Sequence, residues 1–212
     1  MLYHHQCHDE LIAHLVGKMP EIPAEFPVLV RPLLSAPFTV KEDLIILSPG
    51  DVADFAFWPV EGYIRCFKAF KREEDREHYD QKTIEISLPG KIWLPVDSYM
   101  NRNPVDFYVE ISKGTTLVAF SRKSFEELVA AMPEVGLLAL AIISAAEHDW
   151  LKKLEMCKVD GKTGYETFLD FFGLSVESFI WLMHIANYIG LNKGSLSRIR
   201  TEGGFSDEHL RK

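Results

Sequence analysis

The sequence has few cysteines, and their spacing excludes a disulfide framework. Its 212 residues contain three, Cys7, Cys66 and Cys157, which are scattered and odd in number. Such usage suits a reducing compartment. The first residues also lack a basic segment followed by an apolar run and a small-residue cleavage site, so no signal peptide is predicted and we expect a cytoplasmic protein.

The chain likewise lacks an excess of positive charge and a membrane-length apolar run. Its net charge of −8 argues against a protein that coats nucleic acid along its whole surface. The most apolar segment, Val135–Ala146, has only 12 residues, whereas a membrane span needs about 20. Any nucleic-acid contact must therefore be local, and no membrane association is expected.

Side chains that carry chemistry are sparse in the centre of the chain. Between positions 38 and 121 the only histidine is His78, too few for an iron or zinc centre built on several histidines. No serine or cysteine has a convincing neighbouring base in sequence. We predict that the protein is not an enzyme and has no cofactor. Metal binding by the N-terminal histidines is a less favoured alternative to a frayed terminus and a short helix over 9–18 (His4, His5, His8 and His14).

Short apolar segments separated by turn residues dominate positions 38–121. Gly50 and Gly62 lie at turn signals between such segments. Many short strands with glycine turns predict an all-β sandwich or barrel. The expected strands are 44–47, 54–60, 63–71, 83–88, 105–111 and 115–120, and the charged stretch Arg72–Lys82 is expected to be a solvated loop.

A long helix is predicted after the strands. Pro133 and Glu134 suit its first turn, and it should extend to about Cys157. Val135–Ala146 is apolar nearly all round, which implies burial on two sides. The simplest second partner is the same helix of another subunit about a two-fold axis, and an internal core helix of a monomer is the alternative. A hinge is expected over 158–164, where Gly161 and Gly164 supply flexibility.

The most informative segment is HIANYIGLNKGSLSRIR, residues 184–200. Its apolar residues are spaced to pack two short helices against each other. Gly190 suits the sharp turn between them, and Asn192 is a good N-cap for the second helix. Positions 193, 194, 197, 198 and 201 should then face outward.

This segment has three basic residues and no acidic one, within an acidic chain. A local basic face on a helix suits the DNA major groove, and Arg198 is the best candidate for a bidentate contact with guanine. A plain helical hairpin with a solvated polar face is the alternative.

HIANYIGLNKGSLSRIR resembles the C-terminal helix-turn-helix of the Crp/Fnr family of bacterial transcription regulators. PGDVADFAFWPVEGYIRCF is similar to the first half of the family's cyclic-nucleotide-binding β-roll. The resemblance implies a homodimer that binds near-palindromic double-stranded DNA and contacts RNA polymerase. Gly194 replaces an acidic residue of the best-known members, so specificity should differ. The DNA-contact candidates are Asn192, Lys193, Gly194, Ser195, Ser197, Arg198 and Arg200.

The family's cyclic-AMP contacts are not retained in the matching stretch, 90–111. Its Gly-Glu pair falls at Leu94-Pro95, and its Arg-Ser/Thr pair falls at Val105-Asp106. Because a desolvated cyclic phosphate needs a cation or several N–H donors, we do not expect cyclic AMP to bind. Cys7 alone also disfavours the iron–sulfur branch of the family.

Another, more apolar effector is possible, although the aromatic residues of this stretch could instead simply fill the roll. The candidate residues for an effector pocket are Trp93, Leu94, Tyr99, Arg102, Asp106, Phe107 and Tyr108.

Together these features predict an α+β protein with an N-terminal double-stranded β-roll, a long dimerisation helix and a C-terminal winged helix-turn-helix. The expected divisions are 1–132, 133–157 and 158–212. Three functional classes remain: a DNA-binding regulator with a degenerate nucleotide pocket, a cyclic-nucleotide sensor using contacts foreign to the family, and a β-roll interaction module that has lost DNA binding.

Overall fold

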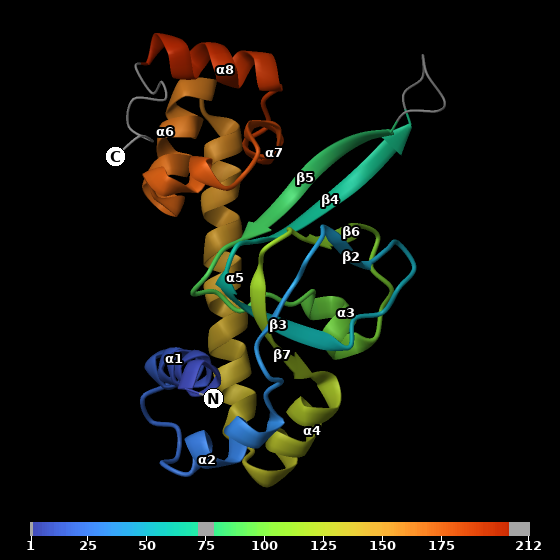
Figure 1. The fold of residues 1–212 in the computed structure, drawn as a ribbon, viewed down its shortest axis with the longest axis vertical. Helices are drawn as coiled ribbons and strands as arrows, with labels where there is room; N and C mark the ends of the chain where they lie inside the picture. The colour runs from blue at the N-terminus through green and yellow to red at the C-terminus, as the bar shows by residue number, and fades with distance from the viewer. Residues whose placement is uncertain (1, 72–78, 204–212) are drawn as a thin grey trace. The chain divides into compact units, whose positions relative to one another are not determined.

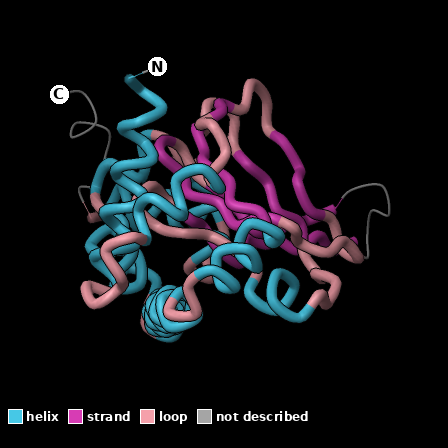
Figure 2. The backbone as a smooth tube through the Cα atoms, turned by 90° about the horizontal axis from the view of Figure 1, so that it is seen from below, coloured by secondary structure: helices cyan, strands magenta, loops and turns pink. Residues whose placement is uncertain are grey.

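Two antiparallel sheets form the β structure of this computed structural model (Figures 1 and 2), which describes residues 2–71 and 79–203, with side chains for 6–70 and 80–203. A three-stranded sheet has the order β1-β7-β3, from β1 (Phe38–Thr39), β7 (Thr116–Ser121) and β3 (Phe55–Glu61). A four-stranded sheet has the order β2-β6-β4-β5, from β2 (Leu44–Leu47), β6 (Tyr108–Ile111), β4 (Ile64–Lys71) and β5 (Tyr79–Ser87). These sheets confirm the predicted β-roll architecture.

Gly62 turns the chain from β3 into β4 with a φ of 78°. A Cβ at this position would lie 2.2 Å from the Thr115 hydroxyl oxygen and 2.7 Å from the Thr115 Cα. Glycine is therefore required here for both its conformation and its size. Gly50 also has a positive φ, of 100°, but a Cβ there would meet nothing within 4 Å. Both predicted turn positions are confirmed.

Strands β5 and β6 begin at other residues than the sequence predicted, and β3 contains a register shift. Strand β5 begins at Tyr79, so 79–82 is not the loop that we expected, and 72–78 lies outside the described residues. Strand β6 begins only at Tyr108. The register of β3 against β7 shifts between Pro59 and Glu61, where proline has no N–H to donate to the ladder.

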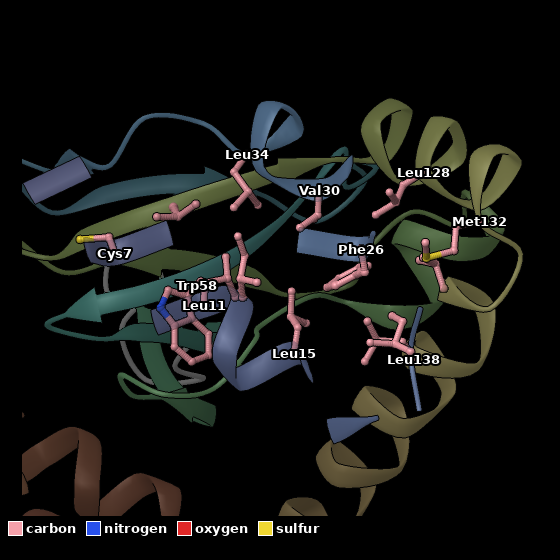
Figure 3. Packing of buried hydrophobic residues seen from close by; sticks show 14 residues of the cluster. Cys7, Leu11, Leu15, Phe26, Val30, Leu34, Trp58, Leu128, Met132 and Leu138 are labelled. Atoms are coloured by element: carbon pink, nitrogen blue, oxygen red, sulfur yellow. The ribbon is translucent and has the colours of Figure 1, made fainter. Parts of the chain in front are cut away.

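Four helices pack against the three-stranded sheet or one another in the N-terminal part of the fold: α1 (Leu2–Lys18), α2 (Phe26–Val30), α4 (Arg122–Ala131) and the first half of α5 (Val135–Lys158). Figure 3 shows Leu15, Phe26 and Leu138 converging from α1, α2 and α5. Helix α1 is longer than predicted, and Cys7 on it is 2% exposed. The expected frayed start was wrong, because the helix begins at Leu2 and Cys7 belongs to the core cluster.

One short helix, α3 (Val96–Asn101), was not predicted. Its N-cap, Pro95, makes no side-chain cap hydrogen bond, and its C-cap, Arg102, has a left-handed φ of 65° without being glycine. Ordinary start and stop signals are therefore missing from the sequence. Arg122 supplies a cation at the C-terminal end, where its guanidinium donates to the carbonyls of Tyr99 and Met100.

The C-terminal helices are α6 (Gly161–Phe172), the 3-10 helix η2 (Leu174–Ser178), α7 (Leu182–Tyr188) and α8 (Lys193–Glu202). The predicted hinge was wrong in extent, because only residues 159 and 160 separate α5 from α6. Asp160 caps α6 by accepting from the backbone N–H groups of Lys162 and Thr163. A Cβ on Gly164 would lie 2.4 Å from the Met156 carbonyl oxygen, so this glycine permits close packing rather than flexibility.

The contacts divide the chain into two compact units, 1–66 with 87–146, and 67–86 with 147–212. We call these the roll unit and the helical unit. Within the described parts of the chain, no helix is long and apolar enough to cross a membrane. Residues 204–212 lie outside the described part of the chain, and the predicted wing and the divisions at 132 and 157 stay predictions.

Candidate functional site

The turn between α7 and α8 has the geometry that the sequence predicted. Gly190 has a φ of 79°, and the Leu191 N–H donates to the Ala186 carbonyl at 2.8 Å, closing the end of α7. Asn192 then begins α8, and its side chain accepts from the Ser195 N–H at 2.8 Å. The glycine turn at the end of α7 and the Asn192 N-cap thus fix the angle at which α8 leaves the turn.

The inner faces of the two helices are buried within the helical unit. Ile185, Ala186 and Leu196 are fully buried, and Ile189 is nearly so. Ala186 is small where the helices meet, as the spacing indicated. The predicted apolar faces of this pair are therefore confirmed.

The opposite face of α8 is polar and exposed. Lys193, Gly194, Ser197 and Arg198 are all exposed, as is the capping residue Asn192, whereas Ser195 is half-buried. This exposed polar face of α8 carries Lys193 and Arg198, and no acidic residue lies between them in the sequence. We call it the α8 face.

Arg200 occupies a different environment from the α8 face. Its Nε lies 2.9 Å from Oε1 of Glu177 in η2, and the two side chains are only 18% and 10% exposed. The hydroxyl of Tyr165 in α6 donates to the same carboxylate, and burial raises the pKa of Tyr165. Arg200 therefore connects three elements of the helical unit, a role that the sequence did not indicate.

A second buried cation of the helical unit was also missed. Lys153 on α5 is 8% exposed, and its ammonium donates to the Ile84 carbonyl of β5. The same ammonium lies 4.7 Å from the Trp150 ring centroid and 4.9 Å from that of Tyr188. No sequence signal joins residues this far apart along the chain.

The seven residues predicted for an effector pocket are not brought together at one site. Only Leu94 and Tyr99 line the main apolar cavity of the roll unit. Trp93 is buried, and its backbone N–H and carbonyl pair with Phe57 at 2.8 Å. Arg102 forms an ion pair with Asp54 at 2.8 Å. Asp106 is exposed, and Phe107 and Tyr108 are half-buried beside or in β6.

This apolar cavity has a volume of about 90 Å³ and lies between α1, α2, α3, α4, α5 and strands β3 and β7. Its lining is almost wholly apolar and includes Leu15, Phe26, Trp58 and Leu138, which Figure 3 labels. Tyr99 is the lining residue with a hydroxyl, and no charged side chain contributes. The cavity therefore suits apolar rather than ionic molecules.

No group of three or more histidine, cysteine, aspartate and glutamate side chains with metal-binding geometry occurs among the residues described. His8 contacts the Ser35 carbonyl at 2.8 Å, and the His14 ring packs against Trp58 in a tilted arrangement with ring centroids 4.7 Å apart. The side chains of His4 and His5 lie outside the described part of the chain.

Comparison with solved structures identifies the fold. FixK2 from Bradyrhizobium japonicum is 17% identical over 78% of this chain and 82% of its own, with a TM-score of 0.60. A protein from Silicibacter pomeroyi described as a cAMP-binding regulator is 14% identical over 90% and 86%, with a TM-score of 0.61. A regulator of the crp/fnr family from Eubacterium rectale is 16% identical over 88% and 85%, also with a TM-score of 0.61.

No protein-family model and no curated protein matches the chain. Identities of 14–17% establish the fold alone. That likeness extends over most of the chain and confirms the α+β class that the sequence indicated. The chain has the fold of the Crp/Fnr-type transcription regulators, with their cyclic-nucleotide-binding-like β-roll.

Proposed function

We propose that this chain is a DNA-binding transcription regulator of the Crp/Fnr type that acts as a homodimer. The observation that carries the proposal is the α8 face, a basic surface on a helix that is capped at its start and buried on its other side. Two of the solved structures with the same fold, those from Silicibacter pomeroyi and Eubacterium rectale, are named as regulators, which favours a regulator over an enzyme.

Arg198 and Lys193 are the principal DNA ligands in this proposal. Both are exposed on α8, and a helix of this kind enters the major groove with its N-terminal turns against the bases. Arg198 contacts a base and Lys193 a phosphate, while Asn192, Gly194, Ser195 and Ser197 lie close enough to the groove to add polar contacts. Arg200 ranks below them because Glu177 already holds its guanidinium.

The dimer forms through α5. Leu137, Leu140, Leu151 and Leu154 on this helix are 58%, 61%, 53% and 36% exposed. Their spacing fits the first and fourth positions of a heptad repeat, which is the pattern of two helices packed along one seam. We call these four leucines the α5 seam. A two-fold dimer would carry its two α8 helices to successive major grooves, about 34 Å apart.

The test of DNA binding begins with selection of bound fragments from a pool of random duplexes by the full chain. A near-palindromic site should emerge. Arg198→Ala should then weaken binding to that site by about 1–3 kcal/mol and relax the preference at one base pair. Lys123→Ala, which removes an exposed cation of the roll unit, is the matched control and should change neither quantity.

Other outcomes would point elsewhere. An equal loss on specific and random duplexes would make Arg198 a phosphate anchor. No salt-dependent binding to any duplex would contradict the proposal and favour an interaction module. RNA polymerase is proposed as a partner on the resemblance alone, and co-purification in the presence of the selected site tests it.

The dimer has a separate test. Leu140→Asp together with Leu151→Asp places charge on the α5 seam and should give a monomer in sedimentation equilibrium. Lys152→Asp changes a charged residue that lies between Leu151 and Lys153 on the same helix, and it should leave the dimer intact. A monomeric wild-type chain at tens of micromolar would contradict this part of the proposal.

The proposed regulator does not respond to cyclic AMP. Arg102, the arginine of the nucleotide stretch, is paired with Asp54, and Asp106 would repel a phosphate. Calorimetric titration with cyclic AMP and cyclic GMP should therefore show no binding. Micromolar binding would favour the sensor that uses contacts foreign to the family.

A further inference from the structure

The lining of the apolar cavity of the roll unit includes one residue with a hydroxyl group, Tyr99. Tyr99 is 2% exposed, and its hydroxyl has no hydrogen-bond partner among the described residues. A buried hydroxyl without a partner costs free energy, and native proteins rarely tolerate one. The unpaired Tyr99 hydroxyl beside this apolar cavity therefore suggests that a bound molecule supplies its hydrogen-bond acceptor.

Tyr99 is held in place by contacts on both sides of it in α3. The Ser98 hydroxyl oxygen accepts from the Ala53 N–H at 2.9 Å, and Arg122 donates to the Met100 carbonyl at 2.8 Å. Its ring contacts that of Phe125, with centroids 6.1 Å apart. Burial also raises the pKa of Tyr99, so its hydroxyl remains a neutral donor at physiological pH.

We propose that this cavity binds a small, uncharged, mainly apolar molecule with one hydrogen-bond acceptor, which pairs with the Tyr99 hydroxyl. A cavity of roughly 150 Å³ lined by apolar side chains binds benzene, so a volume of about 90 Å³ limits the ligand to a molecule smaller than benzene, such as a four-membered ring or a short chain. Ions and nucleotides are excluded because no charged side chain lines the space.

This site differs from the pocket that the sequence indicated. It shares Leu94 and Tyr99 with that set, but it extends to α1 and α2 and to Val135, Leu138 and Ile142 on α5. The ligand would thus contact the helix that carries the α5 seam. Binding itself does not depend on the proposed DNA contacts and is tested without DNA.

The experiment compares two molecules of equal shape, cyclobutanone and methylenecyclobutane, in which CH₂ replaces the carbonyl oxygen. Each is titrated into the full chain by calorimetry, with the thermal midpoint and the fluorescence of Trp58 and the other tryptophans as second readouts. Cyclobutanone should raise the thermal midpoint and bind about tenfold more tightly than methylenecyclobutane, because only cyclobutanone accepts a hydrogen bond.

Tyr99→Phe is the matched variant, since it removes only the hydroxyl. In this variant the two molecules should bind with equal affinity. Contacts between cyclobutanone protons and the methyl groups of Leu15 and Val118, detected by nuclear Overhauser effects, should locate the ligand in the wild-type cavity. Absence of binding by both molecules at millimolar concentration, or a tenfold preference that persists in Tyr99→Phe, would overturn the proposal.

Discussion

The β-roll and the α8 face place their charged groups in opposite ways. In the roll, Arg65 is 2% exposed and forms a two-pronged pair with Glu110, at 3.0 and 3.2 Å. In the helix pair, Lys193 and Arg198 project into solvent. The two members of the buried pair are 45 residues apart in the chain, whereas the devices that orient α8 act over six residues or fewer.

A binding surface that lies within one local segment can be recognised in the sequence. A binding site that needs residues from several elements becomes visible only in the folded chain. A surface read by a large partner can be built from one local segment. A site for a small molecule must be enclosed, and the enclosing residues come from α1 to α5 and two strands. Mutations should therefore act globally in the roll and locally in the helix pair.

The largest effect is expected for Glu110→Gln. It leaves the buried Arg65 guanidinium without its carboxylate, which should lower the free energy of unfolding by about 3 kcal/mol. Chemical denaturation of the full chain measures the loss. Glu126→Gln is the control, because Glu126 pairs with Arg122 at the surface and should cost less than about 1 kcal/mol. Equal costs would show that Arg65 does not need this carboxylate.

Gly62→Ala should follow, with a loss of about 2–4 kcal/mol from left-handed strain and overlap with Thr115. Gly50→Ala has the same sign of φ but open space around its Cβ, so it should cost only about 1 kcal/mol. The difference between the two variants isolates the close approach of β3–β4 to Thr115. Similar losses would mean that the neighbouring backbone moves aside.

Asn192→Ala should have a smaller and more local effect. Removing the acceptor of the Ser195 N–H destabilises the start of α8 by about 1 kcal/mol. Hydrogen exchange should show faster exchange at the first amides of α8 while the amides of β3 and β7 keep their protection. Asn192→Ser, which retains an acceptor, should restore most of that protection. Faster exchange throughout the chain would contradict the local character of this helix pair.

The smallest expected effect is a pH dependence at His14. Burial, with a further contribution from Lys18, lowers the pKa of His14 below 6.5. The unfolded chain therefore takes up a proton at His14 before the folded chain does, and stability declines as the pH falls below about 6.5. His14→Gln should lose less stability than wild type between pH 7.5 and 5. Identical slopes would show that His14 titrates alike in both states.

Sequence reasoning succeeded where the relevant contacts are local. The residue types at Gly190 and Asn192 predict a turn and a helix N-cap, and both residues contact near neighbours in the chain. It failed where a residue's partner is distant. Gly161 and Gly164 suggested flexibility, but Gly164 instead admits the Met156 carbonyl.

The sites show the same division. Arg198 was placed outward correctly, whereas the attachment of Arg200 to Glu177 depends on an element 23 residues earlier. The effector candidates were drawn from one stretch, although the cavity takes two of them and completes its wall with Leu15, Phe26 and other helical residues. Helix α3 was missed because Arg102 ends it in a conformation normally marked by glycine.

The contact between Gly164 and the Met156 carbonyl leaves no clearance between the end of α5 and the start of α6. Because even a Cβ at position 164 would overlap that carbonyl, a change in the angle between these two segments has to displace backbone atoms. A rotation of the last turn of α5 should therefore move the start of α6 with it.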